Sequence, residues 1–180
     1  DLGAPGQLKE AHLLLLPAPD DAGTPLPTLT TIRQVRSLSQ EDADRRYPVR
    51  VEGVVTALFG NGPNLVIQDS DQGIYLAIPL SSRHSLLQIG DLCRIHGFTR
   101  SGAFAPMISA DKVVRLGLGH LPEPVRPALD QILNGSLDSQ YVEIEGLVTR
   151  IDGQGVRILT RIGSIEIDLG SRTAAEWRRF

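Results

Sequence analysis

The 180-residue sequence lacks most features that mark an enzyme or a membrane-spanning chain. Its single cysteine, Cys93, excludes an intrachain disulfide, and this leaves cytosol and periplasm equally compatible with the sequence. No apolar run approaches the roughly 20 residues that a membrane helix needs. A Gly-x-Ser-x-Gly elbow, a phosphate loop and a Gly-rich dinucleotide signature are all missing. We therefore expect a non-catalytic chain that holds no cofactor.

Aromatic residues and excess positive charge are also scarce. Phe, Trp and Tyr make up 4% of the sequence, the net charge is −3 and the pI is about 5.8. Non-specific nucleic-acid binders need positive charge to neutralise phosphates, so the composition disfavours nucleic acid as a partner. Five arginines lie close together in the sequence and could form a local basic patch: Arg33, Arg36, Arg45, Arg46 and Arg50. The acidic residues Glu41, Asp42 and Asp44 lie among them and favour a solvated helix face instead. The four histidines are dispersed, without the close ligand spacing of a zinc site.

What the sequence does contain is a repeat. The segment YVEIEGLVT at residues 141–149 matches PVRVEGVVT at residues 48–56, at an offset of 142 − 49 = 93 residues. Leu129 and Ile132 likewise follow Ile32 and Val35 at an offset of 97. Because a unit of about 90 residues can bury a working core, the repeat predicts two copies of one domain.

The first copy has the element order of an OB-fold. Short runs of alternating or β-branched residues predict strands at residues 49–58, 65–68, 74–78, 92–98 and 107–116. Gly53 would mark a bend or bulge in the first strand. A short helix at 81–88 would plug one end of the barrel, and a helix at 30–35 with a turn at 39–44 would cover it. Cys93 alternates with Ile95 and is expected in the interior.

The second copy follows a proline-rich connector and is incomplete. Strands are expected at residues 142–151, 155–161 and 164–169, with the start of a plug helix at 173–180; strands four and five are missing. We thus predict a mainly β chain of tandem OB-fold-like barrels with short helices, divided into 1–28 (irregular), 29–118, 119–127 (linker) and 128–180. An incomplete barrel exposes strand edges, so we expect disorder near the end or completion by another chain, for example in a homodimer.

The candidate binding site comes from the usual OB-fold position. OB-folds bind on the outer face of strands two and three and on the loops between strands one and two and between strands four and five. In this sequence that face and those loops contain Phe59, Asn61, Gln68, Tyr75, Arg100 and Phe104. In one interpretation these residues form an apolar platform with polar edges. In the other, the aromatic side chains only cover the ends of the barrel.

Several of these segments resemble a known family. Residues 30–39, 47–56, 66–69, 73–75, 90–91 and 104–106 resemble the N-terminal extracytoplasmic region of bacterial membrane-bound sensor histidine kinases, often hybrid ones. The resemblance implies a pair of OB-like units between a signal sequence and a transmembrane helix. It further implies a periplasmic input module that senses an unknown small molecule or protein. Contact with the membrane would come only through a transmembrane segment outside this chain.

Two other functions fit the same fold. The chain could be an OB-fold protein that binds single-stranded nucleic acid, and the cytoplasm is the alternative to a periplasmic location. It could also be a structural or dimerisation domain. Strong, salt-dependent oligonucleotide binding would favour the first of these, and a large self-interface without ligand binding would favour the second.

Overall fold

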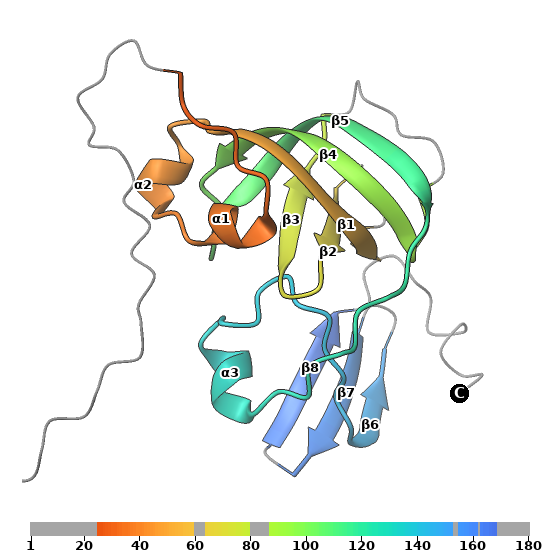
Figure 1. Cartoon of the computed structure of the whole chain (residues 1–180). Coiled ribbons are helices and arrows are strands. Elements are labelled where there is room, and N and C mark those ends of the chain that lie inside the picture. Colours follow the sequence, from red (N-terminus) through yellow and green to blue (C-terminus); the bar gives the residue numbers. More distant parts are fainter. Residues whose placement is uncertain (1–24, 60–63, 80–86, 153–154, 162, 169–180) are drawn as a thin grey trace, which may run out of the picture.

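The first unit is a closed five-stranded barrel. The computed structural model describes residues 25–59, 64–79, 87–152, 155–161 and 163–168. The barrel strands pair in the order β1-β2-β3-β5-β4, and all pairs are antiparallel except β3 with β5 (Figure 1). Their bounds are β1 Pro48–Leu58, β2 Leu65–Gln68, β3 Gly73–Ala77, β4 Asp91–Arg100 and β5 Met107–Leu118. The predicted mainly β, OB-like fold is confirmed.

The alternation of apolar and polar residues places the core inside this barrel. Along β1, Val49, Val51 and Val55 are buried, whereas Arg50 and Glu52 are exposed. The same period of two places apolar side chains of the other four strands in one cluster, including Ile67, Ile74, Leu76, Cys93, Ile95 and Ile108. Cys93 is buried as predicted.

Two short helices cover one end of the barrel. Helix α1 (Ile32–Arg36) begins after Thr31, whose side chain accepts a hydrogen bond from the Gln34 N–H, and its Ile32 and Val35 are fully buried. Helix α2 (Gln40–Ala43) is joined to β4 through the buried Thr99, whose hydroxyl donates to the Ala43 carbonyl at 2.7 Å. The predicted helices at 81–88 and 173–180, and residues 1–24, lie wholly or mainly outside the described residues.

Asp91, at the start of β4, has a buried carboxylate. It accepts a hydrogen bond from the Gln88 N–H at 2.9 Å and one from the Arg115 Nε–H at 2.8 Å. The bond from Gln88, followed by the attraction of Arg115, holds the pKa of the Asp91 carboxyl below its ordinary value although burial opposes this. A folded pKa below the unfolded one stabilises the fold above the unfolded pKa, and this contribution is lost as the pH falls.

We therefore predict that Asp91→Asn weakens the acid sensitivity of the barrel. As the pH falls below about 5, the melting temperature of the wild type should fall more steeply than that of the variant, because only the wild type takes up a proton at this carboxylate on unfolding. Asp111→Asn removes an exposed carboxylate from β5 and serves as the control. Equal slopes for Asp91→Asn and the wild type in calorimetric melts would contradict the assignment.

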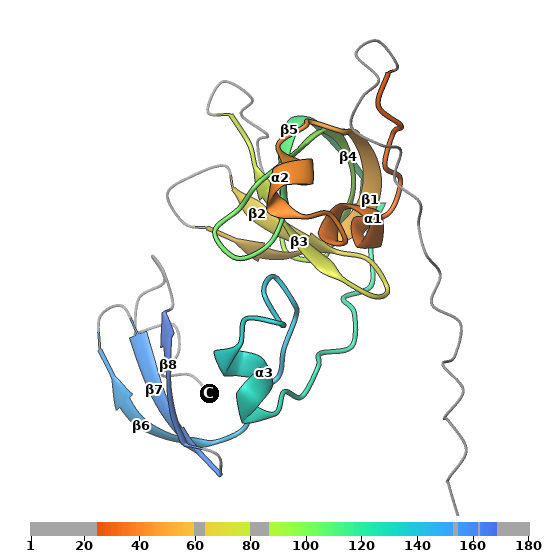
Figure 2. The same ribbon diagram turned by 90° about the vertical axis from the view of Figure 1, so that its left-hand side faces the viewer.

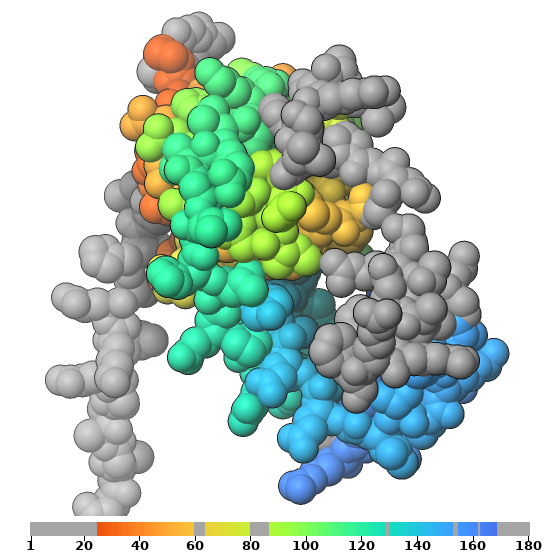
Figure 3. All heavy atoms as spheres, turned by 90° about the vertical axis from the view of Figure 1, so that its right-hand side faces the viewer, coloured from red at the N-terminus to blue at the C-terminus, as the bar shows by residue number. Residues whose placement is uncertain are grey.

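The second unit repeats the first half of the barrel. It consists of helix α3 (Leu129–Leu133) and a three-stranded sheet of β6 (Leu147–Ile151), β7 (Gly155–Thr160) and β8 (Gly163–Asp168). A parallel bridge joins Leu29 to Val49 in the first unit and Val125 to Val142 in the second. Figure 2 shows α3 on the inner side of the curved sheet β6–β8, below the first barrel. In Figure 3 the chain after β5 runs over the surface from the barrel to the second unit.

Even the irregularities recur in the same places. The β1–β2 pairing shifts register between Val55 and Ala57, and the β6–β7 pairing shifts between Val148 and Arg150, which are the equivalent positions at an offset of 93. A bulge at the same point in two strands increases the local twist of both sheets in the same way. The observed register thus extends the repeat from sequence pattern to backbone geometry.

One predicted strand is shorter in the structure. The expected strand at 142–151 begins only at Leu147. In the first unit the N-terminal half of β1 pairs with β4, and its C-terminal half pairs with β2. No strand equivalent to β4 pairs with the second unit among the described residues, so residues 143–146 have no ladder partner. The apolar face of this sheet is also less covered than that of the barrel: Ile158, equivalent to buried Ile67, is half-buried.

Candidate functional site

The outer face of β2 and β3 retains one exposed aromatic pair. Tyr75 lies on β3 between the inward-facing Ile74 and Leu76, and is half-buried. Its ring packs against Phe59, with centroids 5.5 Å apart and planes tilted by 50°. Phe59 itself is 48% exposed. The pair is therefore an accessible apolar surface at the position where OB-folds bind their ligands.

The neighbouring part of this face is covered by the second unit. Gln68, on β2, is buried, and its side-chain oxygen accepts a hydrogen bond from the Tyr141 N–H at 2.8 Å. The backbone of Ser139 lies so close to Gly73 that a Cβ on Gly73 would overlap the Ser139 carbonyl oxygen. Ser139 makes this approach with φ 60°, a left-handed conformation that is costly for a residue with a side chain.

An arginine from the first helix completes this contact. Arg36 on α1 donates to the Gly73 carbonyl at 3.2 Å, and its guanidinium is 3.6 Å from the Asp138 carboxylate. The Arg36 side chain is only 13% exposed, so the ion pair is shielded from water more than a surface pair. We call these residues the interunit contact: Arg36, Gln68 and Gly73 of the first unit with Asp138, Ser139 and Tyr141 of the second.

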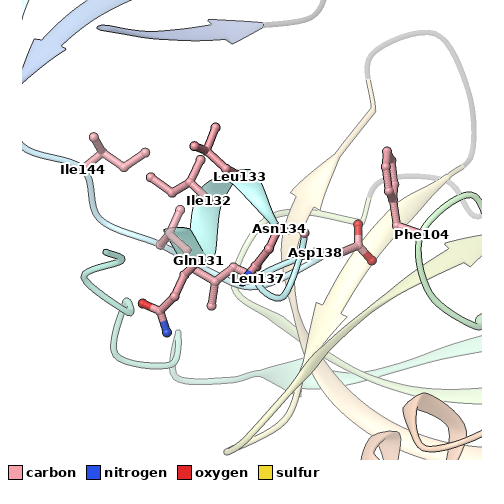
Figure 4. A pocket seen from close by; sticks show the side chains of 10 residues that line it. Phe104, Gln131, Ile132, Leu133, Asn134, Leu137, Asp138 and Ile144 are labelled. Atoms are coloured by element: carbon pink, nitrogen blue, oxygen red, sulfur yellow. The ribbon is translucent and has the colours of Figure 1, made fainter. Parts of the chain in front are cut away.

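Beside the interunit contact lies a groove that both units line. It has a volume of about 510 Å³ and is bordered by Phe104 of the β4–β5 loop and by the segment from α3 to Ile144. Figure 4 shows Ile144 at one end and Phe104 at the other, with the α3 side chains Ile132 and Leu133 and then Asp138 between them. We call this the interunit groove; its lining is Phe104, Gln131, Ile132, Leu133, Asn134, Gly135, Leu137, Asp138, Val142 and Ile144.

The structure places the six predicted site residues in different surroundings. Phe59 and Tyr75 touch each other, and Phe104, which is 80% exposed, borders the interunit groove. Gln68 is engaged by the second unit, and Arg100 is exposed at the end of β4. Asn61 lies outside the described residues.

Sequence reasoning missed the α3 side of the site. Leu133, Leu137 and Asp138 belong to the second copy, and a pattern of strands and turns does not tell which surface of one copy meets the other. One usable signal was Gly73: a glycine at the start of a strand often marks the close approach of another backbone.

The described residues contain one buried thiol, that of Cys93. Burial, followed by the nearby Asp91 carboxylate, raises the pKa of the Cys93 thiol to about 11, so this thiol is not a nucleophile at neutral pH. No group of three or more His, Cys, Asp or Glu side chains in the described ranges is arranged to hold a metal ion. Across the same ranges, no helix has the length and apolar character to cross a membrane.

Comparisons with known proteins add little to this picture. No family model and no curated protein matches the chain. The hypothetical protein ygiW from E. coli is similar over 52% of this chain and 98% of its own, with 16% identity and a TM-score of 0.42. A putative aspartyl-tRNA synthetase from Leishmania major Friedlin is similar over 67% of this chain and 29% of its own (11% identity, TM-score 0.36). Apo TiaS, a tRNAIle2 agmatidine synthetase, is similar over 82% and 33% (15% identity, TM-score 0.37). Likenesses this distant carry no argument about function.

Proposed function

We propose that the chain is a non-catalytic ligand-binding sensor module whose ligand lies in the interunit groove, beside the outer face of β2 and β3. The observation that supports this most directly is the double lining of the groove: Phe104 comes from the barrel, and Leu133 and Leu137 come from the second unit. A ligand there contacts both units at once. Its binding energy therefore depends on how the units are placed, and by the same linkage the ligand stabilises one placement over others.

The interunit contact gives this coupling a physical route. Asp138 lines the groove and also pairs with Arg36 of the barrel. Ligand atoms that approach Asp138 change the surroundings of this shielded ion pair. Ser139 and Tyr141, whose backbone contacts Gly73 and Gln68 of the barrel, come directly after Asp138 in the chain. Occupation of the groove is thus transmitted to the contact that holds the two units together.

A thermal-shift screen with matched variants tests the proposal. We expect a compound from a set of metabolites, oligosaccharides and short peptides to raise the melting temperature of the wild type. Phe104→Ala should weaken this response about tenfold or more in apparent affinity, because it removes an exposed ring that lines the groove. Tyr75→Ala should weaken it as well, because Tyr75 is a half-buried ring on the outer β2–β3 face beside the groove. Both should leave the unliganded fold within about 1 kcal/mol of the wild type, since neither side chain is buried.

Leu118→Ala is the matched control, because Leu118 is 81% exposed on β5 and does not line the groove. A ligand whose stabilising effect is equal in wild type, Tyr75→Ala and Phe104→Ala would place the binding site elsewhere. Strong, salt-dependent binding of single-stranded oligonucleotides in the same screen would favour a nucleic-acid-binding protein instead.

A dimerisation role has one observation in its favour. Leu147, Val148 and Leu159 are each about half exposed or more on the strands of the second unit. Exposed apolar strands of this kind are typical of protein interfaces. Sedimentation of the intact chain distinguishes the two functions: a stable dimer that responds to no compound supports dimerisation, and a ligand response in a monomer supports the sensor.

For the cellular setting we propose the extracytoplasmic part of a membrane-bound sensor histidine kinase. The support is the sequence resemblance of segments such as residues 47–56 and 73–75, which lie in β1 and β3 of the barrel except for Tyr47, the residue before β1. The coding sequence that flanks these 180 residues tests this. It should encode a transmembrane segment and a kinase region, and a reading frame without either would contradict the setting while leaving the binding site untouched.

A further inference from the structure

A second, polar groove lies on the outside of the barrel, away from the residues of the interunit groove. It has a volume of about 620 Å³, within the range of small-molecule sites. Its walls come from the segment before α1, from the outer faces of β1 and β4, and from the end of β2. The lining residues are Thr30, Thr31, Arg50, Glu52, Asp69, Arg94 and His96.

The pairing of strands sets Arg50 and His96 side by side. They are direct partners in the β1–β4 ladder, and Glu52 and Arg94 are the next outward-facing pair. Side chains opposite each other on one face of an antiparallel pair lie about 5 Å apart at Cβ. The Arg50 N–H donates to the Leu29 carbonyl at 2.9 Å, which brings Thr30 next to this arginine.

Arg50 differs from most arginines of this chain in its pairing. Eight described arginines have a carboxylate partner within 4.0 Å. On the face of Arg50, the nearest ladder carboxylate, Glu52, is bonded to Arg94 at 2.7 Å. Among the described residues Arg50 has no such partner. Its direct neighbour across the β1–β4 ladder is His96, which is not a carboxylate.

The other groups in this groove divide into donors and acceptors. Thr31 already accepts a bond from the Gln34 N–H, so its hydroxyl hydrogen is free to donate. One oxygen of Asp69 accepts the Asp71 and Gln72 N–H groups, and its second oxygen remains available as an acceptor. The Arg50 end of the groove thus supplies donors, and the Asp69 end supplies an acceptor.

We propose that this groove binds a small hydroxylated metabolite that carries an oxyanion, such as a sugar phosphate or a sugar acid. The Arg50 guanidinium and the His96 imidazole receive the oxyanion, because a planar fork of N–H donors fits two oxygens of a phosphate or carboxylate. The hydroxyl groups of the ligand meet Thr30, Thr31 and Asp69. This site is independent of the interunit groove.

NMR titration of the intact chain with glucose 6-phosphate, glucuronate and glucose tests the assignment. We expect saturable shifts of the Arg50 and His96 side-chain signals with one or both anionic compounds, with a Kd of about 1 mM or below, and no comparable binding of glucose. Binding of glucose 6-phosphate alone identifies a phosphate site, and binding of glucuronate alone a carboxylate site. Arg50→Ala should weaken binding at least about tenfold, and Arg50→Lys should give an intermediate loss because it keeps the charge without the fork.

Two control variants show whether a loss of anion binding is specific to Arg50. Arg126→Ala removes an exposed arginine of the second unit and should leave the affinity unchanged. Phe104→Ala should also bind the anion normally, because Phe104 lines the interunit groove and not this one. This result therefore stands even if the ligand proposed for the interunit groove is never found. The assignment is overturned if neither anion gives a saturable shift up to about 10 mM, if glucose binds as well as the anions, or if folded Arg50→Ala retains wild-type affinity.

Discussion

Ile67→Ala should lower the free energy of unfolding of the barrel by about 2–5 kcal/mol. Ile67 is fully buried at the centre of β2, and its truncation leaves a cavity among interior side chains of neighbouring strands. For a domain of this size that is a large share of the total stability, so part of the variant should be unfolded at moderate urea concentrations. Urea titration followed through the amide NMR signals of β4 measures the change.

The repeat supplies a matched control for this truncation. Ile158 on β7 is the equivalent of Ile67: Ile67 pairs with Val55 and Ile74, and Ile158 pairs with Val148 and Ile165. Because Ile158 is half-buried on an open sheet, Ile158→Ala should cost about 1 kcal/mol or less. Equal costs at the two positions would mean that the second sheet is covered as fully as the first.

Gly73→Ala should release the second unit from the barrel. The new Cβ would overlap the Ser139 carbonyl oxygen, and the overlap is with backbone, so the segment around Ser139 must move away. The hydrogen bond from the Tyr141 N–H to Gln68 should then break. We expect hydrogen exchange of the Tyr141 amide to accelerate at least about tenfold, while exchange in β1 and β4 stays slow.

A second glycine distinguishes this effect from a general loss of stability. A Cβ on Gly97 would overlap the Ser109 carbonyl oxygen, which belongs to β5 of the same barrel. Gly97→Ala should therefore lower the melting temperature of the barrel, whereas Gly73→Ala should change mainly the contact between units. If Gly73→Ala left the Tyr141 amide as protected as in the wild type, the close approach of Ser139 would be wrong.

The barrel was predictable because its information is local. The Gly90–Asp91 turn indicates where β4 begins. Alternation of apolar and polar residues in β1 indicates which side chains face inward, and the structure agrees at Val49, Val51 and Val55. Gly53 was expected to mark a bend or bulge, and the register shift in β1 lies between Val55 and Ala57. Gly53 is where β1 runs close to β2, with the Gln68 carbonyl 3.1 Å from the position of a Cβ.

The site was predictable only on the barrel side. The outer position of Tyr75 follows from strand alternation, and its contact with Phe59 follows from the loop that succeeds β1. The burial of Gln68 does not follow from local pattern, because it depends on where the second unit docks. For the same reason the sequence could not indicate that Leu137 and Phe104 border one groove.

The interunit groove exists only if the second unit covers part of the outer β2–β3 face of the first. Nuclear Overhauser effects from the Gly73 Hα protons of the intact 180-residue chain test this directly, because such effects require protons within about 5 Å of each other. We predict cross-peaks from Gly73 to Ser139 and Gln140, which lie against it in the structure. Their absence, in a sample whose β1–β4 cross-peaks are all present, would show that the two units do not meet at this face and would remove the basis of the proposed sensor site.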